Sequence, residues 1–193
     1  MFGGARDRTL IDTLEGLPCE RLEMTVWRVV RDTRDPTIFS SGGNRWDDGS
    51  FEVLYTSLSR EGALAEMRFH LSRGQPIIPS KLRYRLFSLS VKVGGAIDLC
   101  GKGTLEKLGV DMANFGKLPY LDRVGEYEIC QKIGEAIHFL GSENPGDPTA
   151  MLVPNARYDA RNLVLLGDYT SPDDIEVLEN HGIIDWSAPL GST

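Results

Sequence analysis

The chain has 193 residues, of which 41% are hydrophobic and 25% charged, and its formal net charge is -7. A chain of this length and composition is expected to fold as one soluble domain with a sizeable core. The acidic excess disfavours a protein that binds nucleic acid by neutralising phosphates, which needs a dense Lys and Arg surface. No apolar run in the sequence reaches the roughly 18 residues of a membrane span, so a membrane protein is not expected either.

The N-terminus and the cysteines indicate a cytoplasmic protein. Residues 6–8 are charged, where a signal peptide would need a continuous apolar core. Cys19, Cys100 and Cys130 are odd in number and far apart, which is a poor disulfide framework and suits a reducing compartment. We therefore expect a cytoplasmic location.

Hydrophobic periodicity and turn residues divide the chain into an α+β succession of elements. Residues 1–20 are predicted to form a polar N-terminal arm outside the core, and residues 21–193 a single domain. The predicted helices are residues 9–17, 60–72, 104–108, 126–140 and 172–179, and the predicted strands are residues 25–31, 52–56, 86–93, 150–154 and 162–166. Ser59 is expected to cap the helix at residues 60–72, and Gly94 and Gly95 to end the strand before them.

The residues with the most chemical potential gather in residues 41–66. Arg45 lies in a glycine-rich loop, Tyr55 on the following strand, and Glu66 on the next helix at the edge of its apolar stripe. A guanidinium, a phenol and a carboxylate together suit the binding of a phosphorylated ligand and the cleavage of a bond that develops positive charge. Each residue also has a structural interpretation. Arg45 could stack on Trp46, Tyr55 could be a core residue with a tethered hydroxyl, and Glu66 could be a solvated helix residue.

Other kinds of site lack their motifs in this sequence. Residues 95–103 do not have the spacing of a phosphate loop, and no GxGxxG or GxSxG motif occurs. His70, His138 and His181 are isolated from the close Cys and His spacings that hold zinc, so no metal is expected.

A series of short motifs resembles the RES-domain family of bacterial toxins. The motifs are Trp27-Arg28-Val29-Val30, Gly43-Asn44-Arg45-Trp46, Leu54-Tyr55-Thr56-Ser57, Ala63-Leu64-Ala65-Glu66, Gln131-Lys132-Ile133-Gly134, Leu152-Val153-Pro154-Asn155-Ala156-Arg157 and Asn162-Leu163-Val164. Their order and spacing cover about residues 25–168. Asn155 is a departure, because the family usually has Ser after Val-Pro, and an amide is larger than a hydroxyl and is a different proton carrier.

The resemblance implies an α+β, ADP-ribosyltransferase-like fold with small mixed or antiparallel sheets flanked by helices. It implies NAD⁺ as the substrate and no metal. It also implies a toxin that is opposed by a cognate antitoxin, which often carries a DNA-binding helix-turn-helix domain. The polar arm at residues 1–20 lies outside the match and is a candidate partner-binding segment.

With NAD⁺ as the implied substrate, the chemistry of the residues suggests their roles. Glu66 would stabilise the oxocarbenium-like ribose that forms when the nicotinamide bond of NAD⁺ breaks, or it would hold a ribose hydroxyl or orient the acceptor. Arg28 and Arg45 would bind its phosphates, and Tyr55 would offer a flat face to nicotinamide or ribose. The expected substrate-binding set is completed by Trp46, Ser57 and Asn155. The acceptor of ADP-ribose stays open between a protein side chain, water and phosphate.

A second interpretation comes from another class of protein. In it the chain is a non-catalytic interaction module whose acidic surface binds a basic partner. Arg45 and Glu66 would then form a structural ion pair, and NAD⁺ would be neither bound nor consumed.

Overall fold

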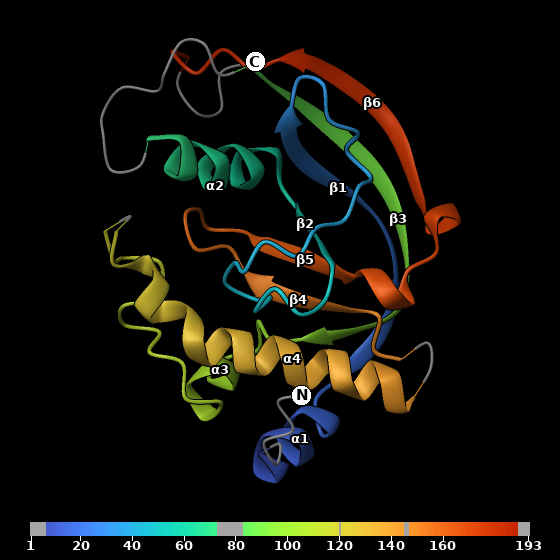
Figure 1. Cartoon of the computed structure of the whole chain (residues 1–193), viewed down its shortest axis with the longest axis vertical. Helices are drawn as coiled ribbons and strands as arrows, with labels where there is room; N and C mark the ends of the chain where they lie inside the picture. The colour runs from blue at the N-terminus through green and yellow to red at the C-terminus, as the bar shows by residue number, and fades with distance from the viewer. Residues whose placement is uncertain (1–6, 73–82, 120, 145–146, 189–193) are drawn as a thin grey trace.

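The computed structural model describes residues 7–72, 83–119, 121–144 and 147–188, and in this part of the chain six strands form one sheet (Figure 1). The strands are β1 (Cys19–Arg31), β2 (Val53–Ser57), β3 (Tyr84–Asp98), β4 (Ala150–Pro154), β5 (Arg161–Leu166) and β6 (Ile175–Ile183). The α-helices are α1 (Arg8–Glu15), α2 (Arg60–Ser72), α3 (Thr104–Lys107) and α4 (Tyr127–Glu143), and the 3-10 turns are η1 (Arg123–Glu126), η2 (Gly167–Tyr169) and η3 (Pro172–Asp174).

The sheet is mostly antiparallel and closes partly on itself. Its strand order is β1-β2-β5-β4-β3-β6, and a further pairing of β1 with β3 joins the first five strands into a ring. Only the β3–β4 pair is parallel among the described strands. In Figure 1, α4 runs below β4 and β5 with α1 beneath it, whereas α2 lies beside β1 and β2. The predicted α+β class, with helices flanking a mostly antiparallel sheet, is confirmed.

Strand β3 continues through Gly94 and Gly95, where the sequence predicted its end. Pairing with β1 carries it on to Ile97, which lies opposite Cys19. Gly95 permits a close approach, because a Cβ there would lie 2.1 Å from Oδ1 of Asp147. Gly95 therefore lets the Asp147 side chain come close, and the two glycines do not interrupt the strand.

Helix α1 is part of the packed structure. The Asp7 side chain caps it by accepting hydrogen bonds from the N–H groups of Thr9 and Leu10. Leu14 is only 1% exposed and belongs to the same core as α4. The expectation that this N-terminal segment lies outside the core is wrong for α1, and β1 already begins at Cys19.

The helix predicted at residues 172–179 is wrong. Pro172 starts only the turn η3, in which Ser171 and Asp174 form a capping box, and the chain then extends as β6. The reason is non-local, because residues 175–183 find hydrogen-bond partners along β3, with Ile175 opposite Val91. A single-sequence pattern does not contain that partner.

Helix α2 has the predicted limits. The Ser59 Oγ accepts a hydrogen bond of 2.9 Å from the Gly62 N–H, which confirms the expected cap. Helix α4 buries Ile133 and Ile137 completely against the sheet. None of the helices in the described residues is long and apolar enough to cross a membrane.

The sheet opens between β1 and β2. These strands share one register pair, Trp27 with Ser57. Beyond it, β2 continues along β5 and β1 along β3. The side chains of Arg28 and Tyr55 consequently face a space between two diverging strands, and this space is the site described next.

Candidate functional site

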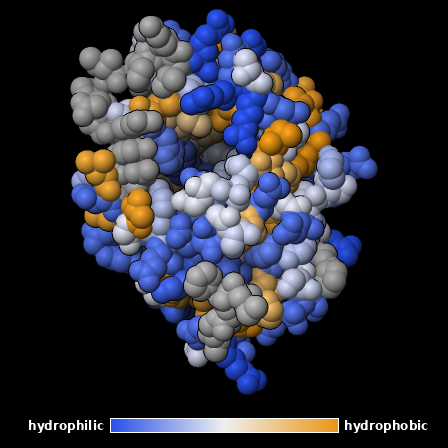
Figure 2. Space-filling view, in the orientation of Figure 1, coloured by the Kyte–Doolittle hydropathy of each residue, from blue (hydrophilic) through white to orange (hydrophobic). Residues whose placement is uncertain are grey.

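A cavity of about 380 Å³ lies where β1 and β2 separate. Its wall is built from β1, β2, α2 and the two loops that carry residues 44–46 and 154–157. Figure 2 shows the molecule hollowed on this face. The volume is within the range of about 300–1,000 Å³ that is usual for small-molecule sites.

The charge of the cavity wall is opposite to that of the chain. Its arginine and acidic lining residues are Arg28, Arg31, Arg34, Arg45, Arg157 and Glu66, so arginines greatly outnumber acids, although the whole chain carries -7. A concentration of guanidinium groups in a partly enclosed space favours an anionic ligand, and arginine suits phosphate especially well.

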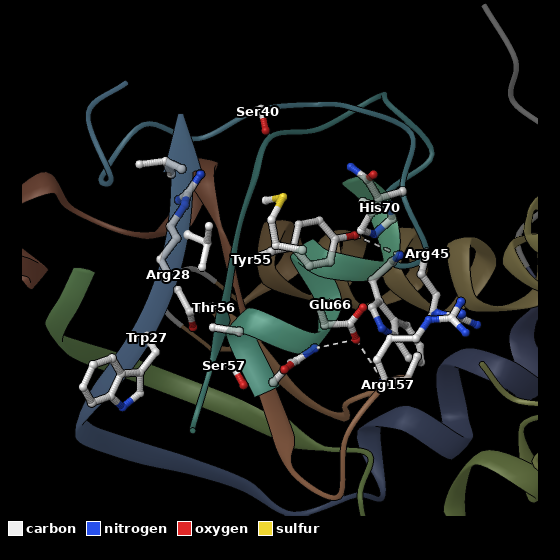
Figure 3. Close-up of a pocket in the computed structure, with 18 of the residues that line it drawn as sticks. Trp27, Arg28, Ser40, Arg45, Tyr55, Thr56, Ser57, Glu66, His70 and Arg157 are labelled. Atoms are coloured by element: carbon white, nitrogen blue, oxygen red, sulfur yellow. Dashed lines mark hydrogen bonds between the residues drawn. The ribbon is translucent and has the colours of Figure 1, made fainter. Parts of the chain in front are cut away.

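Glu66 lies in the middle of this wall. Figure 3 shows its carboxylate between Arg28 on one side and Arg45 and Arg157 on the other. Its Oε1 accepts a hydrogen bond of 2.9 Å from the Ala156 N–H and a longer one of 3.5 Å from the Asn162 amide.

The protonation of Glu66 is set by opposing effects. Burial raises the pKa of the Glu66 carboxyl above its ordinary value of 4.5. The Ala156 N–H, the guanidinium groups of Arg157 and Arg45, and the Asn162 amide act in the other direction and lower that pKa. The site therefore holds a desolvated carboxylate whose charge depends on a few named donors.

Arg45 is enclosed and paired. Its Nη1 lies 2.7 Å from Oε2 of Glu126, and both side chains are less than a tenth exposed. The guanidinium carbon also lies over the rings of Phe115 and Tyr127, at 4.5 and 4.9 Å from their centroids. Arg45 is thus held in one direction by an ion pair and two aromatic faces.

Glu126 binds two backbone N–H groups in addition to Arg45. Its carboxylate accepts hydrogen bonds from the N–H groups of Gly116, at 3.1 Å, and Leu118, at 3.0 Å. The ion pair of Arg45 is therefore with Glu126, and not with Glu66 as the non-catalytic interpretation expects.

Tyr55 uses its hydroxyl for structure. The hydroxyl donates to Oδ1 of Asp47 at 2.7 Å and accepts from the Trp46 N–H at 2.9 Å. Burial and the Asp47 carboxylate raise the pKa of Tyr55 well above 10. The phenol consequently stays protonated and tethered, and its ring is what faces the cavity.

Arg28 is buried and forms no ion pair with any residue that the structure describes. Its side chain comes from β1, and the whole residue is 9% exposed. Nη2 donates to the Ile38 carbonyl at 3.0 Å, whereas Nη1 has no hydrogen-bond partner among the described residues. Burial, and then the charge of Arg34, lower the pKa of Arg28 to about 10. A buried guanidinium in this state favours an anion beside it.

Arg157 closes the wall next to Glu66. Its Nη1 donates to the Gly116 carbonyl, and its guanidinium carbon lies 3.2 Å from the Phe69 ring centroid. Burial lowers the pKa of Arg157, while the charge of Glu66 raises it. The carboxylate and this guanidinium therefore influence each other without a direct ion pair in the described residues.

The remaining predicted ligand residues differ in where they lie. Trp46 is 2% exposed and mainly core, although it touches the cavity, and Ser57 lines the cavity next to the strand split. Asn155 is not in the lining. Its Oδ1 accepts from the N–H groups of Arg157 and Tyr158, and its Nδ2 donates to Asn162, so its amide shapes the turn after β4.

Sequence reasoning missed several residues that build this site. Arg157 and Asn162 stand in the quoted motifs but were given no role, and Asp47, Glu126 and His70 were not singled out for it. His70 was detectable, because it follows Glu66 by one helical turn and lines the same cavity. In the described part of the chain, no three His, Cys, Asp or Glu side chains gather as a metal site requires.

Comparison with known proteins places these features in context. A family profile described as the RES domain matches residues 25–189. Among solved structures, the chain is similar to one in the crystal structure of the MbcT–MbcA toxin–antitoxin complex of M. tuberculosis, with 19% sequence identity and a TM-score of 0.72. That similarity covers 91% of this chain and 92% of the other. The search of curated proteins gave no match.

Proposed function

Because the chain belongs to the RES-domain family, we propose that it is an NAD⁺-consuming enzyme that breaks the bond between nicotinamide and ribose. The ADP-ribose then passes to an acceptor. This proposal makes the cavity between β1 and β2 the active site.

The observation that carries the proposal is the placement of Glu66. A single partly buried carboxylate lies between arginines on both sides, inside a cavity that is otherwise cationic. NAD⁺ has the matching distribution of charge, since its diphosphate is anionic and its nicotinamide ring is cationic. The arginines suit the diphosphate, and the carboxylate suits the positive charge next to it.

The reaction follows from these positions. The C1′–N bond breaks, its electron pair stays on nicotinamide, and nicotinamide leaves as a neutral molecule. The ribose then carries oxocarbenium-like charge, which the ionised Glu66 stabilises more strongly than it stabilises the ground state. Arg28 and Arg45 hold the phosphates, and the Tyr55 ring supports nicotinamide or the ribose edge.

The acceptor is a protein side chain, water or phosphate. Its oxygen or nitrogen bonds to C1′ and releases a proton. We propose as biological role the toxin of a toxin–antitoxin pair, whose cognate antitoxin carries a helix-turn-helix domain and covers the cavity mouth near Arg45 and Tyr55. The solved toxin–antitoxin complex of similar fold supports this role.

The first experiment measures free nicotinamide after the purified protein is incubated with NAD⁺. We expect release by the natural chain and none by Glu66→Gln. The amide keeps an oxygen for the Ala156 N–H, and loss of a buried charge with a raised pKa should not lower the melting temperature. Glu61→Gln is the matched control, because Glu61 lies on the same helix outside the cavity lining.

Unchanged nicotinamide release by a folded Glu66→Gln protein would remove Glu66 from the mechanism, and no release by the natural chain would reject the activity. A second experiment adds cell lysate and labelled NAD⁺. A labelled protein band indicates transfer to protein, whereas a small-molecule product alone indicates water or phosphate as the acceptor.

A further inference from the structure

We infer that Asp47 is a positioning residue, whose buried carboxylate fixes the loop at residues 43–47 and thereby sets the directions of Arg45 and the Tyr55 ring. Its effect on NAD⁺ rests on the proposed function. Asp47 does not line the cavity, so it acts through the residues that do.

The carboxylate of Asp47 is completely buried, and both of its oxygens accept hydrogen bonds. Its exposure is 0%, and Oδ2 accepts a hydrogen bond of 2.7 Å from the Gly43 N–H. Oδ1 accepts from the Asn44 N–H at 3.0 Å and from the Tyr55 hydroxyl at 2.7 Å. No cation forms an ion pair with it in the described residues, so these donors are what stabilise the charge.

This arrangement requires a carboxylate. Both backbone groups can only donate, and they approach different oxygens of Asp47. An asparagine presents one accepting oxygen and one donating nitrogen, so one N–H group would face another donor. The Tyr55 hydroxyl can rotate to suit an amide, but the N–H groups of Gly43 and Asn44 cannot.

The same loop is held from the side of α4. The Gln131 amide donates to the carbonyls of Asn44, at 2.8 Å, and Asp47, at 3.2 Å. The residues before and after Arg45 are therefore both fixed, since the Trp46 N–H donates to Tyr55. Arg45 is thus oriented at two places. The hydrogen bonds to the Asp47 carboxylate fix the backbone around it, and the ion pair with Glu126 fixes its guanidinium group.

The neighbouring Asp48 offers a matched control. It is exposed, and its carboxylate accepts only from the N–H and hydroxyl of Ser50 among the described residues. Asp47→Asn and Asp48→Asn remove the same charge one residue apart. A purely electrostatic effect on ligand binding would be weaker in Asp48→Asn, because solvent screens that exposed charge, so faster amide exchange in Asp47→Asn is what distinguishes a positioning effect.

The experiment uses the full chain and has two readouts. In the first, NAD⁺ binding is measured by calorimetry in a Glu66→Gln background, where no turnover interferes. We expect Asp47→Asn to weaken binding by about tenfold to a hundredfold, as small displacements of a binding group do, and Asp48→Asn to leave it unchanged. In the second, amide hydrogen exchange is measured at residues 43, 44 and 46, and it should accelerate only in Asp47→Asn.

The outcomes separate this inference from the proposed function. Unchanged exchange in a folded Asp47→Asn protein, or equal loss of binding in both variants, would overturn the positioning role. If NAD⁺ does not bind the Glu66→Gln parent, the proposed function is in question while the exchange data still decide whether Asp47 holds the loop. If Asp47→Asn does not fold, Tyr55→Phe, which removes one of the donors to Asp47, must accelerate exchange at residues 43 and 44; residue 46 is left out because its N–H loses its own acceptor in that variant.

Discussion

The two arginines that flank Glu66 differ in what the protein gives them. Arg45 has an ion pair with Glu126 and two aromatic faces, and its backbone neighbours are anchored. Arg28 has one carbonyl on Nη2 and, within the described residues, nothing on Nη1. Both are more than nine-tenths buried, so burial alone does not distinguish them.

The two arginines therefore represent two ways in which a protein can hold a cation at a ligand site: with an anionic partner already in place, or without one. Arg45 already has an anionic partner, although its Nη1 makes no hydrogen bond within the described residues, so it presents a fixed field and loses little freedom when a ligand arrives. Arg28 is left incomplete, so an anion would satisfy it and the free protein carries the cost of its burial. Substitutions of Arg45 and Arg28 should therefore differ in their effects on stability and on NAD⁺ binding.

The largest effect is expected on the stability of the Arg45 side. Arg45→Ala leaves the Glu126 carboxylate buried without its cation, which should lower the free energy of unfolding by about 3–5 kcal/mol. Urea denaturation measures this loss. The double variant Arg45→Ala with Glu126→Gln should recover part of it, and a loss in the single variant below about 1 kcal/mol would mean that the pair behaves like an exposed one.

On the Arg28 side we expect the reverse pattern. Arg28→Met keeps the aliphatic bulk and removes an incompletely paired charge, so the free energy of unfolding should not fall. NAD⁺ binding should weaken by about 1.5–3 kcal/mol, which is roughly tenfold to a hundredfold, because charge-assisted hydrogen bonds to phosphate are lost. Calorimetry in the Glu66→Gln background tests this. Full affinity with lowered stability would reverse the distinction between the two arginines.

The smallest effect concerns the pH dependence of turnover. Activity should require ionised Glu66 and fall as pH decreases through its pKa, which burial places above 4.5. The charge of Arg157 lowers that pKa, so Arg157→Gln should raise it and move the acid limb of the pH–rate profile to higher pH.

The matched comparison for that profile is Arg28→Met. Arg28 is not among the groups that shift the pKa of Glu66, so its acid limb should stay where it is in the natural chain. An equal displacement in both variants would indicate a general field effect and not a local one.

Local signals predicted the parts of the fold that depend on neighbouring residues. Ser59 and the apolar spacing after it were sufficient for α2, because a cap and an amphipathic stripe act within a few residues. Strand β6 was predicted as a helix because its stability comes from β3, about ninety residues earlier in the chain.

The residues of the site also fall into those that the sequence indicated and those that it did not. The sequence brought Arg45, Tyr55 and Glu66 together, and the cavity does contain all three. It did not indicate that the Tyr55 hydroxyl would be occupied by Asp47, although a tethered phenol was one of the alternatives. Glu126 was not predictable, because its role arises from a carboxylate of η1 meeting a loop residue 81 positions away.

Gly134 of α4 has a consequence for how the site can change. A Cβ at this position would lie 2.0 Å from the carbonyl oxygen of Trp46, so helix and loop touch backbone to backbone. The loop that carries Arg45 therefore rests directly on the backbone of a seventeen-residue helix, in addition to the hydrogen bonds from the side chains of Asp47 and Gln131. A partner that bends or shifts α4 from its outer side would therefore move Arg45 as well, and could change the cavity without contacting its mouth.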